Sequence, residues 1–515
     1  MPTIDNPNHS RPLDVHRWSD HPEVKALVEK LWEEHQLGTS SAEQGGKPST
    51  GPKPATPTIK QLRVLILDLY VAWLEDPELS IGVSMSPNHW KTNTRYNALH
   101  LSKKLIPLIN TLREVGLLDL APGSYAGSGA KGNRTTRIRA AEPLQAMFRK
   151  AKFARDDVTR FDGEETIILR DEKDANRAGK QVEYQDTETT TTMRQELQSY
   201  NELLAASFID IATLQEPVIR GEAERESPDI QIHRDHSRVR RIFSRSNWEM
   251  NGRFYGGWWQ RVNDDWRSKI FINDQPTVEV DFKGLHVAML YARAGQAMEH
   301  DPYELPGTKM SETETVYLGY PAELARKLCK KLALTAINAK EKSSAYRAFR
   351  EGFPAQHFAK RLTNAQLDKF LDCFLQRNPA LTDSLFSDEG IRLMYLDSQI
   401  TAHIHRHFTE QDIPVLSVHD SYIIDHMKVA ELRRVMAEAS EAIVGRALPT
   451  AIKLPDAPEY EFVSDEQLQE YIENRVNGRC AGYMERVFDY QERTGRRICP
   501  VVKGDERLDH ALSLE

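Results

Sequence analysis

The strongest structural signal in the chain lies in VEVDFKGLHVAMLYA, residues 278–292, and in PVLSVHDSYII, residues 414–424. In the first stretch, a β-branched apolar run ends at Asp281 and a glycine follows three residues later, which predicts a strand that ends on an aspartate. In the second, two apolar runs flank the pair His419-Asp420, which predicts a hairpin with the acid at its turn. Taken singly, each aspartate is more often a helix cap or a turn residue than a catalytic group.

A predicted helix lies between these two stretches, at AELARKLCKKLALTAIN, residues 322–338. Arg326, Lys330, Leu334 and Asn338 recur at intervals of four residues, so they share one face of this helix. A basic stripe is more often a solvated face than a binding surface. The opposite flank supplies the predicted buried side, with Leu324, Leu328, Leu332 and Ile337.

Phosphoryl transfer requires two carboxylates and a cationic helix face, and these motifs supply both. Two carboxylates from separate strands hold two Mg²⁺ ions about 3.5–4 Å apart, which clamp the attacking and leaving oxygens. A cationic helix face binds the triphosphate and neutralises the charge that develops on the leaving pyrophosphate. Asp281 and Asp420 are therefore the predicted metal ligands, and Arg326 and Lys330 the predicted catalytic cations. Mg²⁺ is the expected cofactor, with Mn²⁺ as a substitute.

In this order, the three motifs resemble motifs A, B and C of a polymerase superfamily. This superfamily joins the DNA polymerase I-like (family A) enzymes with the single-subunit RNA polymerases of phages and mitochondria. Upstream, NGRFYGGWWQ at residues 251–260 resembles the family segment whose arginine contacts the primer–template, which is Arg253 by analogy. The similarity covers roughly residues 236–445 and is specific only as an ordered set. It implies a right-hand palm and fingers with a two-metal mechanism.

The choice of sugar is read from the same resemblance. Motif A of the DNA-making branch ends in a glutamate that blocks a ribose 2′-hydroxyl, whereas this chain has His286 there. Thr335 and the sequence HDSY (419–422) match the RNA-making branch better, which favours acceptance of ribonucleotides. Asn338 replaces the motif B tyrosine that stacks near the incoming sugar and base. The resemblance thus places His286, Thr335 and Asn338 beside the nucleotide, and the loss of the tyrosine leaves both sugar choice and fidelity open.

Several side chains near these motifs have two interpretations. Glu279 and Asp425 flank the two key aspartates and either support them from behind or lie at the surface, and the surface is the preferred interpretation. Tyr255, Trp258 and Trp259 suit base stacking as well as they suit a core at a domain junction, so both interpretations stay open.

An N-terminal module is predicted over residues 59–150. Helical periodicity over Ile59–Leu74 and Tyr96–Val115 is followed by Gly116 in the place of a C-cap glycine. A short apolar run, a glycine-rich turn and the strand-like sequence RTTRIRA come next. This order of helix, turn and hairpin resembles a winged helix.

The predicted hairpin is basic. Its cations are Lys131, Arg134, Arg137 and Arg139, with no acid from 131 to 139. Such a hairpin suits a phosphate backbone, because each cation displaces condensed counterions. The alternative is a solvated hairpin on a protein-binding domain. DNA is the expected partner of this module.

Composition sets the remaining expectations. The net charge of −8 weakens the case for a nucleic-acid partner slightly, although local patches decide where a polyanion binds. The four cysteines are scattered, no apolar run reaches the roughly 18 residues of a membrane span, and no signal peptide is visible, so we expect a cytoplasmic protein without a membrane partner. The predicted class is α+β.

Two polar tracts, residues 38–58 and 170–192, suggest where the parts of the chain are separated. The predicted parts are a short helical segment and flexible linker (1–58), the winged helix (59–150), a connector with a possible reduced thumb at Met193–Asp210 (151–235), the palm and fingers (236–460) and a C-terminal helical segment (461–515).

Two functions of different classes remain in competition. The preferred one is a Mg²⁺-dependent, DNA-templated polymerase of the primase or small replicative type, with DNA and NTPs or dNTPs as partners. The alternative is a non-catalytic replication initiator or regulator that binds DNA and carries a degenerate polymerase-like domain. Asn338 and the short segment between motifs B and C favour the alternative, whereas the intact Asp281, Arg326, Lys330 and Asp420 favour the enzyme. The need for a primer and the choice between RNA, DNA and untemplated synthesis stay open.

Overall fold

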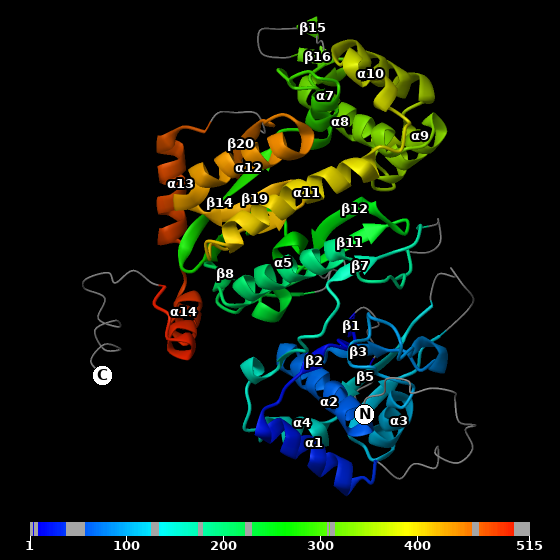
Figure 1. The fold of residues 1–515 in the computed structure, drawn as a ribbon, viewed down its shortest axis with the longest axis vertical. Coiled ribbons are helices and arrows are strands. Elements are labelled where there is room, and N and C mark those ends of the chain that lie inside the picture. The colour runs from blue at the N-terminus through cyan, green and yellow to red at the C-terminus, as the bar shows by residue number, and fades with distance from the viewer. Residues whose placement is uncertain are drawn as a thin grey trace. The chain divides into compact units, whose positions relative to one another are not determined.

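The computed structural model describes residues 4, 9–37, 57–124, 133–173, 179–221, 229–305, 308–309, 315–455 and 463–498. The chain forms two compact units: Met1–Thr187 with Val218–Gln231, and Glu188–Pro217 with Ile232–Glu515. Each unit combines helices with strands, so the expected α+β class is confirmed (Figure 1). None of the described helices is both long and apolar enough to cross a bilayer.

The first unit is built around a buried helix and a four-stranded sheet. Helix α2 (Thr58–Glu75) is apolar on most of its surface, and eleven of its residues are buried. The sheet has the order β1-β3-β5-β4, with β1 parallel to β3 and the other pairs antiparallel. Its strands are β1 (Ser10–Pro12), β3 (Ser80–Val83), β4 (Leu118–Ala121) and β5 (Thr136–Ala140). The shorter elements of this unit are α1 (Pro22–Glu34), α4 (Glu142–Arg149), β2 (Arg17–Trp18), β6 (Thr159–Arg160), β7 (Ile167–Leu169), β9 (Val218–Ile219) and β10 (Ile230–Gln231).

The N-terminal helix belongs to the same core. Val24, Val28 and Leu31 of α1 are buried in one cluster with α2. The predicted boundary near residue 58 therefore does not separate two cores, because α1 needs the apolar face of α2 to bury its own.

Helix α3 (Leu105–Glu114) starts nine residues later than the sequence predicts. The amide of Asn97 explains the difference, since it donates to the carbonyls of Lys91 and Leu101 and accepts from the Leu101 N–H. Asparagine side chains that bond nearby backbone in this way compete with helix formation. The predicted C-cap is confirmed, because Gly116 has φ +74 just after the helix.

The second unit contains a sheet of order β18-β19-β14-β13-β8, with β20 paired to β14 on the same edge as β13. Its strands are β8 (Ile209–Ile211), β13 (Ile270–Ile272), β14 (Gln275–Phe282), β18 (Leu416–Val418), β19 (Ser421–Asp425) and β20 (Thr450–Lys453). Strands β11 (Arg240–Ser244) and β12 (Asn247–Tyr255) precede β13 in the sequence. They form an antiparallel pair that is not part of this sheet. Strand β14 is central because it pairs with β19 on one edge and with β13 and β20 on the other, and all five residues from Pro276 to Val280 are buried.

Helices pack around these strands (Figure 1). The long helix α11 (Gly390–Thr409) contacts β12, α12 (Val429–Val444), α5 (Glu188–Ala205) and α7 (Leu285–Arg293), and α12 contacts β14 and β19. Between β14 and β18 in the sequence lies a helical group of α8 (Ala322–Asn338), α9 (Lys342–Glu351) and α10 (Asn364–Arg377), in which α8 contacts the other two. The short strands β15 (Thr308–Lys309), β16 (Thr315–Tyr317) and β17 (Tyr320–Pro321) precede α8.

The stretch predicted as a reduced thumb is packed into this unit. The ring of Tyr200 on α5 stacks on His405 with 3.9 Å between centroids, and its hydroxyl donates to the Val415 carbonyl at 2.6 Å. The packing of α5 against α11 does not support a separate thumb there. The C-terminal helices α13 (Asp465–Asn477) and α14 (Ala481–Thr494) are confirmed, and the residues after 498 lie outside the described part of the chain.

Candidate active site

The register of β14 and β19 brings the two predicted aspartates together. Asp281, at the end of β14, pairs with Ser421, the first residue of β19. Asp420 immediately precedes Ser421 in the two-residue turn after β18, and its carbonyl accepts the Phe282 N–H at 3.3 Å. His419, the other turn residue, has φ +58, which a tight hairpin requires. Both sequence predictions, a strand that ends on one acid and a hairpin that turns on the other, agree with these elements.

One oxygen of the Asp281 carboxylate has no hydrogen-bond partner among the described residues. This oxygen, Oδ1, is buried. Burial raises the pKa of Asp281 well above its ordinary value, and the carboxylates of Asp420 and Glu279 raise it further, although Lys453 and Lys330 act in the opposite sense. A buried acid beside other acids is a costly arrangement in a folded protein, and such arrangements concentrate at functional sites.

These donors suit a hard divalent cation. Mg²⁺ is usually bound by one or two carboxylates together with waters and substrate phosphates, rather than by a closed protein cage. Within the described ranges, no three His, Cys, Asp or Glu side chains gather as a group that could hold a metal ion. Asp281 and Asp420 line the pocket together with the carboxylates of Asp264 and Glu279, and the unpaired Oδ1 of Asp281 is an oxygen available to a cation.

Glu279 is buried, so the expectation of a surface position is wrong. Its side chain accepts hydrogen bonds from Arg267 at 2.9 and 3.3 Å and from the Ser421 hydroxyl at 2.7 Å. Glu279 thereby ties β14 to the strand that follows Asp420. Asp425, the other flanking acid, accepts from the Met427 N–H and caps a short turn of helix.

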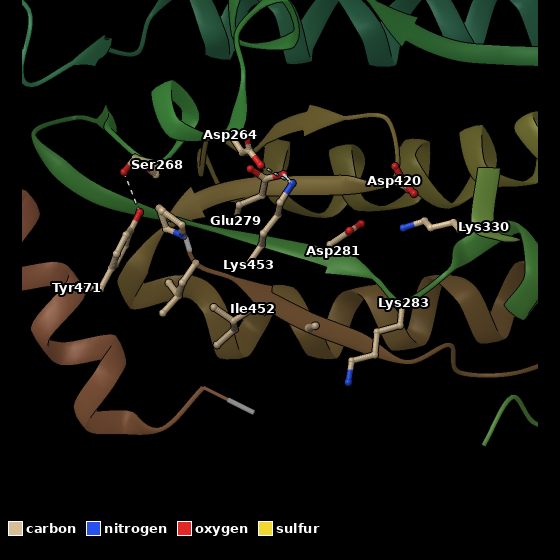
Figure 2. A pocket seen from close by; sticks show the side chains of 13 residues that line it. Asp264, Ser268, Glu279, Asp281, Lys283, Lys330, Asp420, Ile452, Lys453 and Tyr471 are labelled. Carbon is tan, nitrogen blue, oxygen red and sulfur yellow. Dashed lines mark hydrogen bonds and ion pairs between the residues drawn. The ribbon is translucent and has the colours of Figure 1, made fainter. Parts of the chain in front are cut away.

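Lys330 reaches the same site from α8. It lines a pocket of about 470 Å³ together with Asp281 and Asp420, and Figure 2 shows its amine directed toward the two carboxylates. Arg326, one turn earlier, forms an ion pair with Asp301 and lies 5.9 Å from the ring of Tyr303. The Lys330 amine lies 5.8 Å from the same ring, so the two cations differ in that Arg326 is paired with Asp301, whereas Lys330 lines the pocket.

Thr335 and Asn338 do not line the pocket that contains the two aspartates. The Thr335 hydroxyl donates to the Lys331 carbonyl at 2.7 Å, and the Asn338 amide donates to the Leu334 carbonyl at 2.7 Å. Both side chains therefore bond to their own helix. The structure gives them no contact with Asp281 or Asp420.

Arg253 and His286 meet beside the aspartates. The guanidinium of Arg253 forms an ion pair with Asp397 on α11, and its Nη2 lies 3.3 Å from Nε2 of His286. An arginine can only donate, so this contact requires an unprotonated His286 Nε2. Burial, reinforced by Arg253, lowers the pKa of His286 to about 4, in agreement with a neutral ring.

Asp397 was missed in the sequence. It is fully buried, and burial raises its pKa to about 7 against the opposing effect of Arg253, with Asp420 adding to the rise. The available signal was an acid on the apolar face of the helix at residues 390–409, where a charge requires a partner.

The aromatic residues before β13 divide between the two interpretations. Trp258 and Trp259 are 1% and 0% exposed, so they belong to the core. Tyr255 is half-buried, and its ring lies edge-on to His419 with 5.8 Å between centroids. Of the three, only Tyr255 remains a candidate for contact with a substrate at this site.

The basic hairpin of the first unit is less available to DNA than its sequence suggests. Arg139 on β5 is buried and forms ion pairs with Glu78 and Asp119, so we remove it from the predicted phosphate contacts. Arg137 is half-buried, and Arg134 is exposed near the end of the hairpin. Lys131 lies outside the described residues.

Comparison with known proteins finds no match, either among protein-family models or among curated proteins. The geometry alone therefore defines the class: an α+β protein whose second unit sets two aspartates from neighbouring strands and a lysine from a separate helix around one pocket.

Proposed function

We propose that the chain is a Mg²⁺-dependent nucleotidyltransferase, namely a DNA-templated polymerase of the primase or small replicative type that accepts ribonucleotides. The observation that carries the proposal is the pairing of Asp281 with Ser421, which brings Asp420 and Asp281 into one pocket with Lys330. An unpaired buried carboxylate oxygen is difficult to explain as a structural feature, because it costs stability without a partner.

Each side chain has a separate task in this proposal. Asp281 and Asp420 bind the divalent cations, which supply charge neutralisation for the attacking and leaving oxygens when bound. Lys330 binds the triphosphate and stabilises the negative charge of the departing pyrophosphate. Arg253, held by Asp397 and His286, presents a fixed cation to the primer–template next to the aspartates.

The arrangement of elements supports the assignment of palm and fingers. The sheet that contains β14 and β19 carries the acids, and α11 and α12 pack beside it. The helical group α8–α10 enters the chain between the two acid-bearing strands, and its first helix delivers Lys330. In this proposal, the sheet is the palm and the helical group is a reduced set of fingers.

The first unit supports a DNA-binding role. Its strand order β3-β5-β4, with α2 before β3 and α3 directly before β4, is consistent with a winged helix whose wing is the β4–β5 hairpin. Lys131, Arg134 and Arg137 remain the proposed phosphate contacts. This unit would bring synthesis to a particular duplex site.

Incorporation of radiolabelled nucleotides tests the proposal directly. NTPs and dNTPs are offered separately with Mg²⁺ or Mn²⁺ on single-stranded DNA templates, with and without a primer, beside Asp281→Asn and Asp420→Asn. We expect incorporation of NTPs by the unchanged protein and none by either variant. If no combination gives a product while the protein still binds DNA, the non-catalytic initiator replaces the polymerase as the function.

A further inference from the structure

Arg241 on β11 is a buried cation that does not line the pocket of the two aspartates. It is 3% exposed, and burial lowers its pKa to about 10, so the side chain stays charged at neutral pH. The rings of Phe243 and Phe254 each lie 5.1 Å from its guanidinium, and in the described part of the chain no acid forms an ion pair with it. The acid whose charge acts on it, Glu196, is paired with Arg406 at 3.0 Å. A buried charge that no acid neutralises costs stability, which favours a role beyond packing.

The guanidinium of Arg241 joins two segments of the chain. Its Nε donates to the Gly252 carbonyl on β12 at 2.8 Å, and its Nη2 donates to the Ser398 hydroxyl at 3.1 Å and to the Ser398 carbonyl at 3.4 Å. Ser398 lies on α11, which packs along β12 (Figure 1). Gly252 immediately precedes Arg253, and Ser398 immediately follows Asp397. Arg241 therefore holds the chain neighbours of both members of the Arg253–Asp397 ion pair.

The backbone at Gly252 is irregular and closely packed. The register of β11 against β12 shifts between Ile242 and Phe243, and Gly252 is the extra residue of the resulting β-bulge. Its φ is +83, and a Cβ at this position would lie 2.7 Å from Oγ of Ser398, so only glycine fits. Bulges beside active sites change the direction of a side chain, and the side chain that follows this bulge is Arg253.

We propose that Arg241 is a positioning residue, which fixes the bulge at Gly252 against Ser398 so that Arg253 presents its cation to the primer–template. The inference rests on the proposed polymerase function, in which Arg253 makes that contact, and it gives Arg241 no contact with a substrate. A guanidinium suits this task because its planar fork carries N–H donors in fixed directions. Nε can therefore bind one segment while Nη2 binds the other.

Substitutions of Arg241 test the proposal with primed synthesis on a single-stranded DNA template. Arg241→Met removes the forked donor and leaves an apolar side chain between the two phenylalanine rings. It should raise the KM for the primed template about tenfold, as the loss of one charge-assisted contact would, and leave kcat and the KM for the nucleotide within about threefold. Arg241→Lys keeps the charge without the fork, so its KM for the primed template should stay at least about fivefold above that of the unchanged protein. A full return to the unchanged KM would mean that the charge alone matters, and the positioning role would be overturned.

A double-mutant cycle shows whether Arg241 acts through Arg253. Arg253→Met removes the contact with the primer–template itself. In that background, Arg241→Met should raise the KM for the primed template by less than about twofold more, because the cation that it positions is already absent. If the two losses instead multiply in full, Arg241 acts independently of Arg253 and the proposal fails.

Two further variants separate positioning from folding. Arg486 on α14 is the matched control, because it also donates to backbone carbonyls, those of Leu214 and Gln215, and does not line the pocket. Arg486→Met should unfold at a lower temperature and keep the KM for the primed template. Ser398→Ala removes one acceptor of Arg241 with little change in volume and should raise that KM about threefold. If Arg241→Met does not fold, Ser398→Ala decides the question. A lower unfolding temperature with an unchanged KM, in whichever of the two variants folds, overturns the proposal.

The outcomes keep this inference distinct from the polymerase itself. If the unchanged protein incorporates nucleotides and Arg241→Met has the same KM for the primed template, the polymerase stands and the positioning role falls. If the unchanged protein forms no product, the polymerase falls. Fluorescence anisotropy with a short primed template then measures the same cycle as dissociation constants. Weaker binding in Arg241→Met that disappears in the Arg253→Met background supports the positioning role, and equal binding by all the proteins overturns it.

Discussion

Two antiparallel strand pairs, one in each unit, carry charged side chains in opposite ways. In the first unit, Arg139 on β5 faces Asp119 across the register and forms an ion pair with it. In the second unit, β14 and β19 set Asp281 beside Asp420, so that two like charges meet. At the first hairpin the charge is neutralised and serves the fold, whereas two like charges in one pocket indicate a ligand.

The largest expected effect is at the pair of like charges, Asp281 and Asp420. Asp281→Asn should lower nucleotide incorporation on the order of 10³-fold, because it removes a metal-binding oxygen from the transition state. The same change should stabilise the metal-free fold. The pKa of Asp281 is raised in the folded state, so the ionised carboxylate opposes folding. The contribution of this group to the free energy of unfolding therefore falls as pH rises above the pKa that Asp281 has in the unfolded chain.

Thermal unfolding checks the second part. Without metal at neutral pH, Asp281→Asn should unfold at a higher temperature than the unchanged protein. Mg²⁺ or Mn²⁺ at about 100 times its Kd should stabilise the unchanged protein by roughly 2.7 kcal/mol and the variant by much less. If the variant is less stable than the unchanged protein in the absence of metal, the ionised Asp281 beside Asp420 does not oppose folding.

Two neighbouring lysines on α8 give the next largest contrast. Lys330 lines the pocket, whereas Lys331 packs over the ring of Phe353 at 3.8 Å and bonds to the Gly352 carbonyl. Lys330→Ala should lower kcat/KM on the order of 10²-fold, and Lys331→Ala should leave it within about threefold. Steady-state incorporation measures both, and equal losses would show that the helix matters only for folding.

The sequence predicted the parts of this site that follow from local pattern. The end of β14, the hairpin turn at Asp420 and the face of α8 that carries Lys330 are all set by periodicity within one segment. The contacts of Arg253 with Asp397 and His286 join three segments of the chain and leave no local pattern. The pairing of Arg139 depends on Glu78, which is 61 residues away, so its burial needed the structure.

Asp397 should give a smaller, pH-dependent effect. Its pKa is raised to about 7, so the carboxylate takes up a proton as pH falls through about 7 and loses its charged contact with Arg253. Activity should therefore fall several-fold as pH is lowered from about 8 to about 6. Over the same range, the contribution of Asp397 to the free energy of unfolding increases, because the folded state binds the proton more tightly than the unfolded state does.

Variants at two ion pairs check this prediction. Asp397→Asn should have a rate at pH 8 close to that of the unchanged protein at pH 6, without a step near pH 7. Asp388 is the control, because its pair with Arg245 lowers its pKa instead of raising it. Asp388→Asn should keep the change of activity near pH 7. If that change is absent in Asp388→Asn, Asp397 is not its cause.

The smallest effect is expected at the β4–β5 hairpin, where the contrast lies within one strand pair. Arg134 is exposed and Arg139 is buried between Glu78 and Asp119. Arg134→Ala should weaken binding to duplex DNA about three- to tenfold and reduce the slope of log K against log salt by about one, as the loss of a phosphate contact does. Arg139→Ala should leave that slope unchanged and instead destabilise the first unit by roughly 1–3 kcal/mol, because two acids lose their partner.

Fluorescence anisotropy over a salt series, paired with denaturant unfolding, separates the effects of the two substitutions. A changed slope in Arg139→Ala would mean that the ion pairs open on DNA, and the rule that a neutralised charge serves only the fold would then fail at this hairpin.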